Sequence, residues 1–236
     1  MNNTRASLTS RSLGITLAPM DIPLASPGQA ASNPRQLARK ALSNPLLLEA
    51  LERGLGSDQA RVKYGCANAL RFVSEEHPAL LYSQFNFFRR MLDHRNKILQ
   101  WEAVFVLSQL ARVDTGDRFA KIFRKYFSPI RGPVMITAAN VIQGGARIAR
   151  AKPPLADRIS TEIRKVGRAS YQTPECRNVA IGHAILALQE IFPLLRHRQP
   201  VLQFVLRHLK NPRRATARKA ERFLKLVQSR AKNPKT

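Results

Sequence analysis

The sequence predicts an all-α protein, an α-solenoid of about five helix pairs. Within residues 57–74, small or apolar residues follow Val62 at offsets of three, four, seven, eight and eleven, which trace one face of a helix. Comparable offsets start again at Leu99, Val134, Arg177 and Thr216, about 35 to 43 residues apart. Self-similarity at this period is typical of arrays built from two-helix repeats.

The first pair shows how each unit is built. Asn44-Pro45 opens its first helix, because proline suits the first helical position, where its missing N–H would be unpaired anyway. Gly54 and Gly56 end that helix. Ser57 and Asp58 can accept hydrogen bonds from the free N–H groups of the helix that follows. The unit is therefore a helix, a tight turn and a second helix.

The later pairs follow from proline positions and apolar stripes. The second pair begins at Pro78 and the third at Phe119, and Lys152-Pro-Pro154 breaks the chain before the fourth. Residues 177–192 form the most apolar predicted helix, which we expect to be buried centrally. The last pair joins a helix at residues 201–209 to one at residues 212–228.

Three features inside the predicted helices favour packing over chemistry. Trp101 precedes a seam of small residues, so we expect its ring to pack between neighbouring repeats and not to stack on bases. Gly144-Gly145 lacks the Lys-Ser/Thr signature of a phosphate loop and indicates close helix packing or a weak point in the helix. His183, beside Ile185, is interpreted as a core or groove histidine.

At the first pair the chain resembles the HEAT-repeat (armadillo-like) family. The residues that carry the resemblance are Asp58, Arg61-Val62-Lys63, Cys66-Ala67 and Ala69-Leu70, which match the turn Asp, the Val-Arg step and the small-residue pattern of that family. The resemblance covers roughly residues 45–228, and the third and fourth pairs lack the turn Asp. It implies a right-handed solenoid and names no activity.

The array divides the chain into three predicted parts. Residues 1–43 are rich in Ser, Ala, Asn, Pro and Arg and are predicted to be a disordered segment, with a short helix from Gln36 to Ser43 as an extension of the first pair. A targeting segment is the alternative for this part. Residues 44–228 are the predicted solenoid, and residues 229–236 a basic tail.

Compartment and membrane association follow from cysteine use and hydropathy. Cys66 and Cys176 lie on apolar stripes far apart in the chain, which favours reduced core thiols. No apolar run approaches the ~18 residues that a membrane-spanning helix needs. The sequence therefore predicts a cytoplasmic protein without a transmembrane segment, and it does not indicate an oligomeric state.

Charge is the most informative bulk property. The formal net charge is +25 and the pI about 11.5. Residues 207–236 contain eleven basic residues and one acid, which gives +10 in this last segment alone. Such a bias favours polyanionic partners, above all nucleic acid, with an anionic membrane face or an acidic protein as alternatives.

The sequence contains no recognisable catalytic, cofactor or metal motif. The five histidines form no HExxH pair, and no serine lies in a Gly-x-Ser-x-Gly elbow. Glu75-Glu76 is interpreted as a solvated helix end and not as an acid/base pair. A non-catalytic protein without cofactor or metal is therefore favoured, although a site assembled from distant helices remains open.

The turns between paired helices carry a row of candidate cations. They are Arg61, Lys63, Arg95, Lys97, Arg131, Arg177, Arg213 and Arg214. Equivalent positions in stacked repeats align along one edge, so these residues are predicted to contact phosphates. The alternative is pairing with the turn acids of neighbours, for which Asp58 and Asp93 are candidates.

The final helix is the sharper candidate. Arg214, Arg218 and Arg222 are spaced by four, with Lys225 next to them, and second helices of such arrays line the concave side. Arginine offers a fork of donors that suits phosphate oxygens. The sequence thus predicts a non-catalytic scaffold that binds nucleic-acid phosphates or another polyanion, DNA and RNA not being distinguished.

Two other function classes are compatible with the same sequence. One is a protein–protein interaction scaffold for an acidic partner, for which the basic surface would serve instead. The other is an enzyme similar to the HEAT-like DNA glycosylases, which use Trp and an Asp–Arg pair in a concave cleft. Only Trp101 is present here, and no Asp–Arg pair can be assigned beside it. A HEAT-like bilin lyase has no distinguishing motif in this chain.

Overall fold

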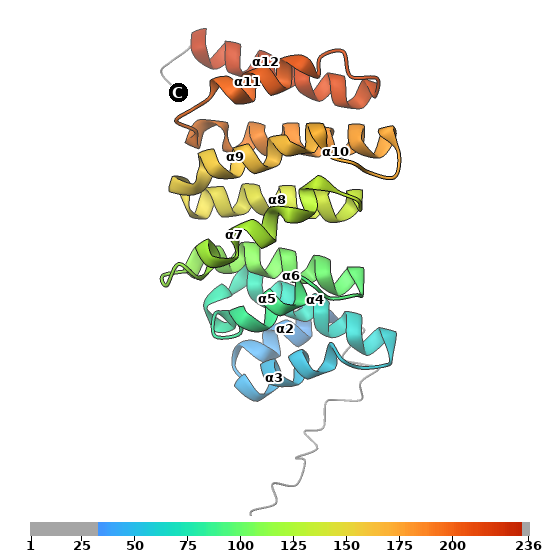
Figure 1. Cartoon of the computed structure of the whole chain (residues 1–236). Helices are drawn as coiled ribbons and strands as arrows, with labels where there is room; N and C mark the ends of the chain where they lie inside the picture. Colours follow the sequence, from blue (N-terminus) through green and yellow to red (C-terminus); the bar gives the residue numbers. More distant parts are fainter. Residues whose placement is uncertain (1–32, 233–236) are drawn as a thin grey trace, which may run out of the picture.

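Helices stacked in chain order form an elongated array (Figure 1). The structure, a computed structural model, describes residues 33–232, and no strand is present among them. The array runs from α2 at one end to α12 at the other. The prediction of an all-α stack of about five helix pairs is confirmed.

Each pair consists of a first helix and a longer second helix. The pairs are α3 (Pro45–Gly54) with α4 (Ala60–Glu76), α5 (Phe85–Met91) with α6 (Lys97–Leu110), α7 (Arg118–Phe127) with α8 (Met135–Ala151), α9 (Ala156–Arg164) with α10 (Pro174–Ile191), and α11 (Gln199–Arg207) with α12 (Arg214–Lys232). Short 3-10 helices cover Pro78–Leu81, Ala111–Val113, Ser128–Arg131, Pro153–Leu155, Lys165–Arg168 and Phe192–Leu194. Consecutive second helices pack on one another and form a continuous layer.

The array extends beyond the predicted limits at both ends. Helix α2 (Pro34–Leu42) packs on α4 and coincides with the short helix expected at residues 36–43, within a segment that the sequence otherwise assigned to disorder. It forms because Asn33 caps its first turn and three small or apolar residues, Leu37, Ala38 and Ala41, bury one face. At the other end α12 continues to Lys232, into the predicted tail. The rest of the predicted N-terminal segment, residues 1–32, and residues 233–236 lie outside the described residues.

The buried faces of the second helices coincide with the predicted seam. Residues that are at most 3% exposed include Ala69, Leu70, Val73, Ala103, Val106, Leu107, Leu110, Ala138, Val141, Ile142, Ala180, Ala184, Ile185, Leu188, Ala220 and Phe223. Many of these side chains are small, so neighbouring helices approach closely and bury apolar surface along the whole length of the array.

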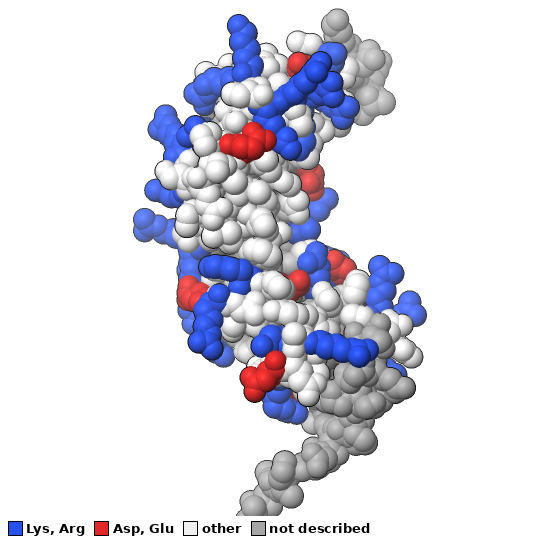
Figure 2. Space-filling view, turned by 90° about the vertical axis from the view of Figure 1, so that its right-hand side faces the viewer, with Lys and Arg blue, Asp and Glu red and all other residues white. Residues whose placement is uncertain are grey.

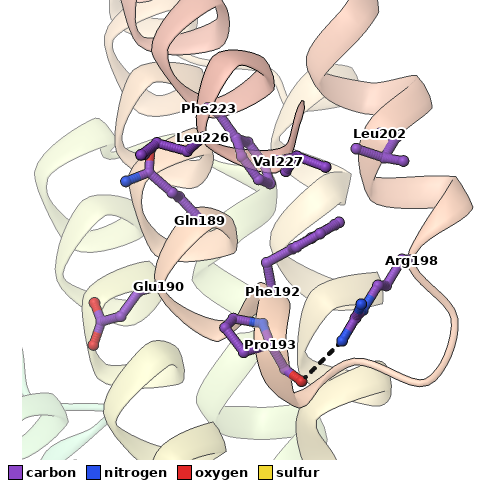
Figure 3. A pocket seen from close by; sticks show the side chains of 9 residues that line it. All are labelled: Gln189, Glu190, Phe192, Pro193, Arg198, Leu202, Phe223, Leu226 and Val227. Carbon is purple, nitrogen blue, oxygen red and sulfur yellow. Dashed lines mark hydrogen bonds between the residues drawn. The ribbon is translucent and has the colours of Figure 1, made fainter. Parts of the chain in front are cut away.

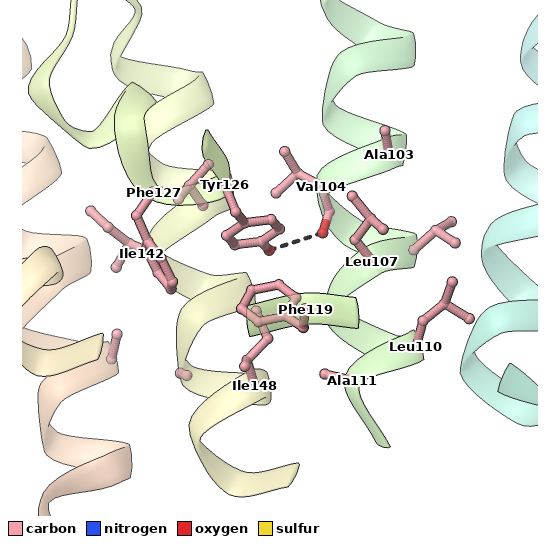
Figure 4. Close-up of a cluster of buried hydrophobic side chains, with 14 of the residues drawn as sticks. Ala103, Val104, Leu107, Leu110, Ala111, Phe119, Tyr126, Phe127, Ile142 and Ile148 are labelled. Carbon is pink, nitrogen blue, oxygen red and sulfur yellow. Dashed lines mark hydrogen bonds between the residues drawn. The ribbon is translucent and has the colours of Figure 1, made fainter. Parts of the chain in front are cut away.

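Close packing in the third pair depends on two glycines. The fully buried Tyr126 points toward α6, where its hydroxyl donates to the carbonyl oxygen of Val104 at 2.9 Å (Figure 4). A Cβ atom at Gly144 would collide with this hydroxyl, and one at Gly145 would lie 2.9 Å from Phe127 Cε1. The Gly144-Gly145 step therefore lets α8 pack tightly against α7, which was one of the two predicted explanations.

A buried carboxylate fixes the junction between the second and third pairs. Asp114 accepts hydrogen bonds from the Tyr82 hydroxyl at 2.7 Å and from the N–H groups of Arg118 and Phe119 at 2.8 and 3.0 Å. Lys152 Nζ lies 3.2 Å from Oδ2, the oxygen that also accepts from the N–H of Phe119. Burial alone would raise the pKa of Asp114, but these hydrogen bonds hold the pKa below its ordinary value.

Candidate nucleic-acid interface

The predicted cations lie along the edge of the array where the paired helices are joined. We call this the turn edge; it consists of residues 55–59, 92–96, 128–134, 165–173 and 208–213. Arg61 and Lys63 lie in the first turn of α4, Lys97 begins α6, and Arg177 lies in the first turn of α10. Arg95, Arg131 and Arg213 lie in the connections themselves. Alternating helix direction thus places all of them on one side.

Pairing with acids neutralises little of this predicted row. Arg213 Nε lies 3.3 Å from Glu175 Oε1, across the seam between α10 and α12. For the other predicted cations, no carboxylate in the described part of the chain lies within 4.0 Å. Asp93 pairs with Lys125 and not with one of the predicted arginines. Pairing with acids of neighbouring repeats, the alternative explanation for the predicted row, therefore accounts for Arg213 alone.

The row is interrupted in the middle of the array. Figure 2 views the molecule from the side on which the α9–α10 and α11–α12 connections lie in Figure 1. Blue side chains gather over the upper and lower parts of this face, whereas its middle is mostly white (Figure 2). In the two middle connections, residues 128–134 contain Arg131 as their only cation and residues 169–173 contain none, whereas Lys165 and Arg168 lie at the start of the second connection. The turn edge thus carries two basic groups and not one unbroken row.

Helix α12 presents its cations away from the rest of the array. Thr216, Ala220 and Phe223 are buried, and Phe223 packs edge-on against Phe192 with 5.2 Å between ring centres. With 3.6 residues per turn, this buried stripe faces α10, and the exposed Arg218 lies on the opposite side of the helix. Arg214, Arg222 and Lys225 are exposed as well and flank it. The row therefore faces out of the end of the array, whereas we expected it in the concave groove.

Two further basic groups, Lys219 and His183, lie in a polar seam between α10 and α12. Thr216 donates to the carbonyl oxygen of Asn178 at 2.8 Å, and Lys219 Nζ would lie 3.3 Å from a Cβ atom at Gly182. Burial, together with Lys219 and Arg213, lowers the pKa of the neighbouring His183. Burial and Arg213 also lower the pKa of Lys219. His183 is half-buried in this seam, in agreement with its interpretation as a groove residue.

The sequence analysis missed a cluster of arginines around one phenylalanine on the second helices. The guanidinium carbons of Arg71 and Arg147 lie 3.7 and 4.5 Å from the ring centre of Phe105. Arg71 is also 3.4 Å from Glu102. Burial, Arg71 and Arg150 lower the pKa of Arg147. These residues come from three successive second helices, so no local motif reveals them, although each lies beside the predicted seam.

Trp101 serves packing and not base stacking in this structure. Its indole N–H donates to Thr137 Oγ1 at 2.8 Å, which ties α6 to α8. The ring is half-buried. This geometry agrees with the prediction that Trp101 packs between neighbouring repeats.

A cavity lies between the ends of α10 and α12 (Figure 3). It has a volume of about 530 Å³, and its walls include Phe192, Leu202, Phe223 and Val227. The Arg198 side chain at its rim donates to the carbonyl oxygens of Pro193 and Leu195 at 3.2 Å. These two hydrogen bonds stabilise the connection between α10 and α11.

The described part of the chain offers no group of three His, Cys, Asp or Glu side chains that could hold a metal ion. Cys66 and Cys176 are both free thiols and half-buried. No helix among residues 33–232 is long and apolar enough to cross a membrane.

Comparison with solved structures gives a likeness of fold. The sequence matches no family model and no curated protein. The crystal structure of an engineered protein superposes with a TM-score of 0.49 at 14% sequence identity, covering 88% of this chain and 93% of that chain.

Proposed function

We propose that the chain is a non-catalytic scaffold of the HEAT-repeat type that binds the phosphates of nucleic acid. The observation that carries this proposal is the outward face of α12. Arg214, Arg218, Arg222 and Lys225 are all exposed there, and no described carboxylate lies within 4.0 Å of them. Like charges held on one helix face repel each other, and a bound polyanion relieves that repulsion.

The rigid position of the row supports phosphate contact. The buried stripe of α12 fixes the helix to α10, so the guanidinium groups extend from an ordered support. Guanidinium forks bind phosphate oxygens with two parallel hydrogen bonds, and such contacts carry no base sequence information. Binding is therefore expected to be independent of sequence and to weaken steeply with salt.

A solubility role for the end of the array is the competing explanation, because terminal repeats need a polar outer face. Polar capping requires hydrophilic side chains and does not require them all to be cationic. Glu221 is the only acid in residues 207–236. This one-sided composition favours an anionic partner over simple capping.

The test removes the charges of the three arginines on α12 and leaves the helix intact. Arg214→Gln, Arg218→Gln and Arg222→Gln together should weaken binding to labelled duplex DNA by more than about tenfold, since roughly one salt-slope unit is lost per phosphate contact. Helicity should not change, because all three side chains are exposed. Unchanged affinity would show that α12 is not the contact surface, and tight binding of polyglutamate in place of DNA would indicate an acidic protein partner.

A further inference from the structure

The first helices end on cations, one repeat after another. Arg53, Arg90, Arg124, Arg164 and Arg207 lie in the last turns of α3, α5, α7, α9 and α11, respectively. We call these five residues the outer column. Each is followed by the connection that forms the turn edge, so the column runs beside that edge on the first-helix layer.

The helix dipole does not account for this column. Cations in the last turn of any helix compensate the partial negative charge there, in either layer. The last turns of α4, α6 and α10 nevertheless contain no Lys or Arg, and that of α8 contains only Arg150. Helix α4 even ends on Glu75 and Glu76, which the dipole disfavours. Across the first four pairs, cations are thus more frequent in the last turns of the first helices than in those of the second helices, which the dipole alone does not explain; α12, the fifth second helix, ends on Arg230 and Lys232.

The outer column is largely uncompensated. Arg53 lies 3.8 Å from Glu49, whereas for the other four no carboxylate among residues 33–232 comes within 4.0 Å. Arg164 Nε is buried without a described hydrogen-bond partner. Burial and the charge of Arg207 on the neighbouring first helix lower the pKa of Arg164. A bound anion would relieve this mutual repulsion.

The column also continues where the middle of the turn edge carries few cations. In Figure 2 blue side chains project along the left-hand border, on the side of the first helices, at the height where the middle of the face is white. Arg124 and Arg164 belong to the third and fourth pairs, whose connections include the cation-poor residues 128–134 and 169–173. The outer column thus joins the two basic groups of the turn edge.

The lack of exposed aromatic side chains among the described residues favours a duplex over a single strand as the ligand. Every Phe, Tyr and Trp of the chain lies within the described range, and none of them is exposed. Proteins that bind single strands without sequence preference stack bases on exposed aromatic rings. A surface of cations without such rings suits an intact duplex, whose bases are already stacked and whose phosphates face outward.

We propose that the outer column is a second phosphate-contacting surface, and that it binds a nucleic-acid duplex along the array together with the turn edge. The proposal rests on the proposed function and specifies its ligand as a duplex, DNA or RNA. Five first helices stacked about 8–10 Å apart span about 40 Å. That distance corresponds to about 12 base pairs at ~3.4 Å per pair.

The test compares two charge-matched triple variants of the full chain. Arg90→Gln, Arg124→Gln and Arg207→Gln remove three exposed cations of the outer column. The control, Arg112→Gln, Lys121→Gln and Arg196→Gln, removes three exposed cations at or next to the connections between pairs, on the opposite edge. Fluorescence anisotropy across a salt series uses a duplex DNA and a duplex RNA of about 15 base pairs and a single strand of the same length.

The outer-column variant should bind both duplexes at least about tenfold more weakly than the wild type, with a salt slope shallower by about two to three. The control should change affinity less than about threefold. Both duplexes should bind the wild type about tenfold or more tightly than the single strand. Equal loss in the two variants, or tighter binding of the single strand, would overturn this inference.

The two proposals fail in different ways. If the wild type binds the duplex and the α12 variant weakens binding while the outer-column variant does not, the outer column is refuted and the proposed function stands. If the wild type binds none of the three nucleic acids, both are refuted. Circular dichroism and thermal melting of each variant ensure that lost binding is not lost folding.

Discussion

Arg213 Nε lies 3.3 Å from Glu175 Oε1, whereas the adjacent Arg214 has no carboxylate within 4.0 Å in the described structure. Two neighbouring arginines at the start of the last helix thus differ in how much charge they can offer a ligand. Glu175 reduces the basic potential at this corner of the array, and it does so from the preceding second helix.

The first prediction follows from that pair. Glu175→Gln frees Arg213 and should tighten binding to duplex DNA a few-fold, with the salt slope steeper by about one. Glu76→Gln is the matched control, because it adds the same charge at the exposed end of α4, at a connection between pairs. Its affinity should stay within about twofold of the wild type. An equal gain in both variants would mean that only net charge matters.

The second prediction concerns pH. Burial, and then Glu49, raise the pKa of Glu52 on α3 from 4.5 to about 7, against a smaller opposing effect of Arg53. The folded state therefore binds the proton more tightly than the unfolded chain, and Glu52 makes stability fall as pH rises from about 4.5 to about 7. Glu52→Gln should raise the melting temperature at pH 8 and leave it nearly unchanged at pH 4. A uniform shift across this range would refute the assignment.

The third prediction compares two aspartates that share a lysine. Lys152 Nζ lies 3.2 Å from the fully buried Asp114 and 2.9 Å from Asp117, whose side chain is 80% exposed. Asp114→Ala should cost about 2 to 4 kcal/mol in urea unfolding, because it leaves buried donors unpaired. Asp117→Asn, which keeps a side chain that suits the left-handed φ of 47° at this position, should cost less than about 1 kcal/mol. Similar costs for the two variants would contradict the role given to Asp114.

The low pKa of Asp114 gives that prediction a pH signature. Its stabilisation is present above the pKa of the unfolded aspartate and is lost as pH falls through the lowered folded value. The difference in stability between the wild type and Asp114→Ala should therefore shrink on acidification below about pH 4.

The fourth prediction tests the packing of α7 on α8. Alanine normally stabilises a helix over glycine by about 1 kcal/mol. Gly144→Ala should nevertheless destabilise the protein by about 1 to 3 kcal/mol, because its methyl group meets the Tyr126 hydroxyl. Adding Tyr126→Phe removes that hydroxyl and should recover part of the loss. Additive effects of the two substitutions would show that the collision does not occur.

The fold was predictable because it rests on local periodicity. The offsets that begin at Val62 and Leu99 mark side chains that the structure buries, including Ala69 and Ala103. Helix α2 was expected only as a short extension of the first pair, at residues 36–43, because it is nine residues long and lies in a composition typical of disorder. Its burial depends on contact with α4, which a local pattern does not show.

The candidate interface was predictable only in part. The spacing of Arg214, Arg218 and Arg222 was visible, and the same helical wheel places them opposite Phe223, a clue to the outward face. The partners of Asp114 lie up to 38 residues away in sequence, so tertiary contact alone brings them together. The outer column, by contrast, repeats once per helix pair and could have been recognised from the sequence.

The measurement that tests the central claim most directly is the salt dependence of wild-type binding to a labelled duplex of about 15 base pairs. Contact with the phosphates predicts micromolar or tighter binding at low salt and a log–log slope of about −4 or steeper, since each neutralised phosphate contributes about −0.9. Absence of binding at about 0.15 M salt, or a slope near zero, would contradict a phosphate-binding surface on this array.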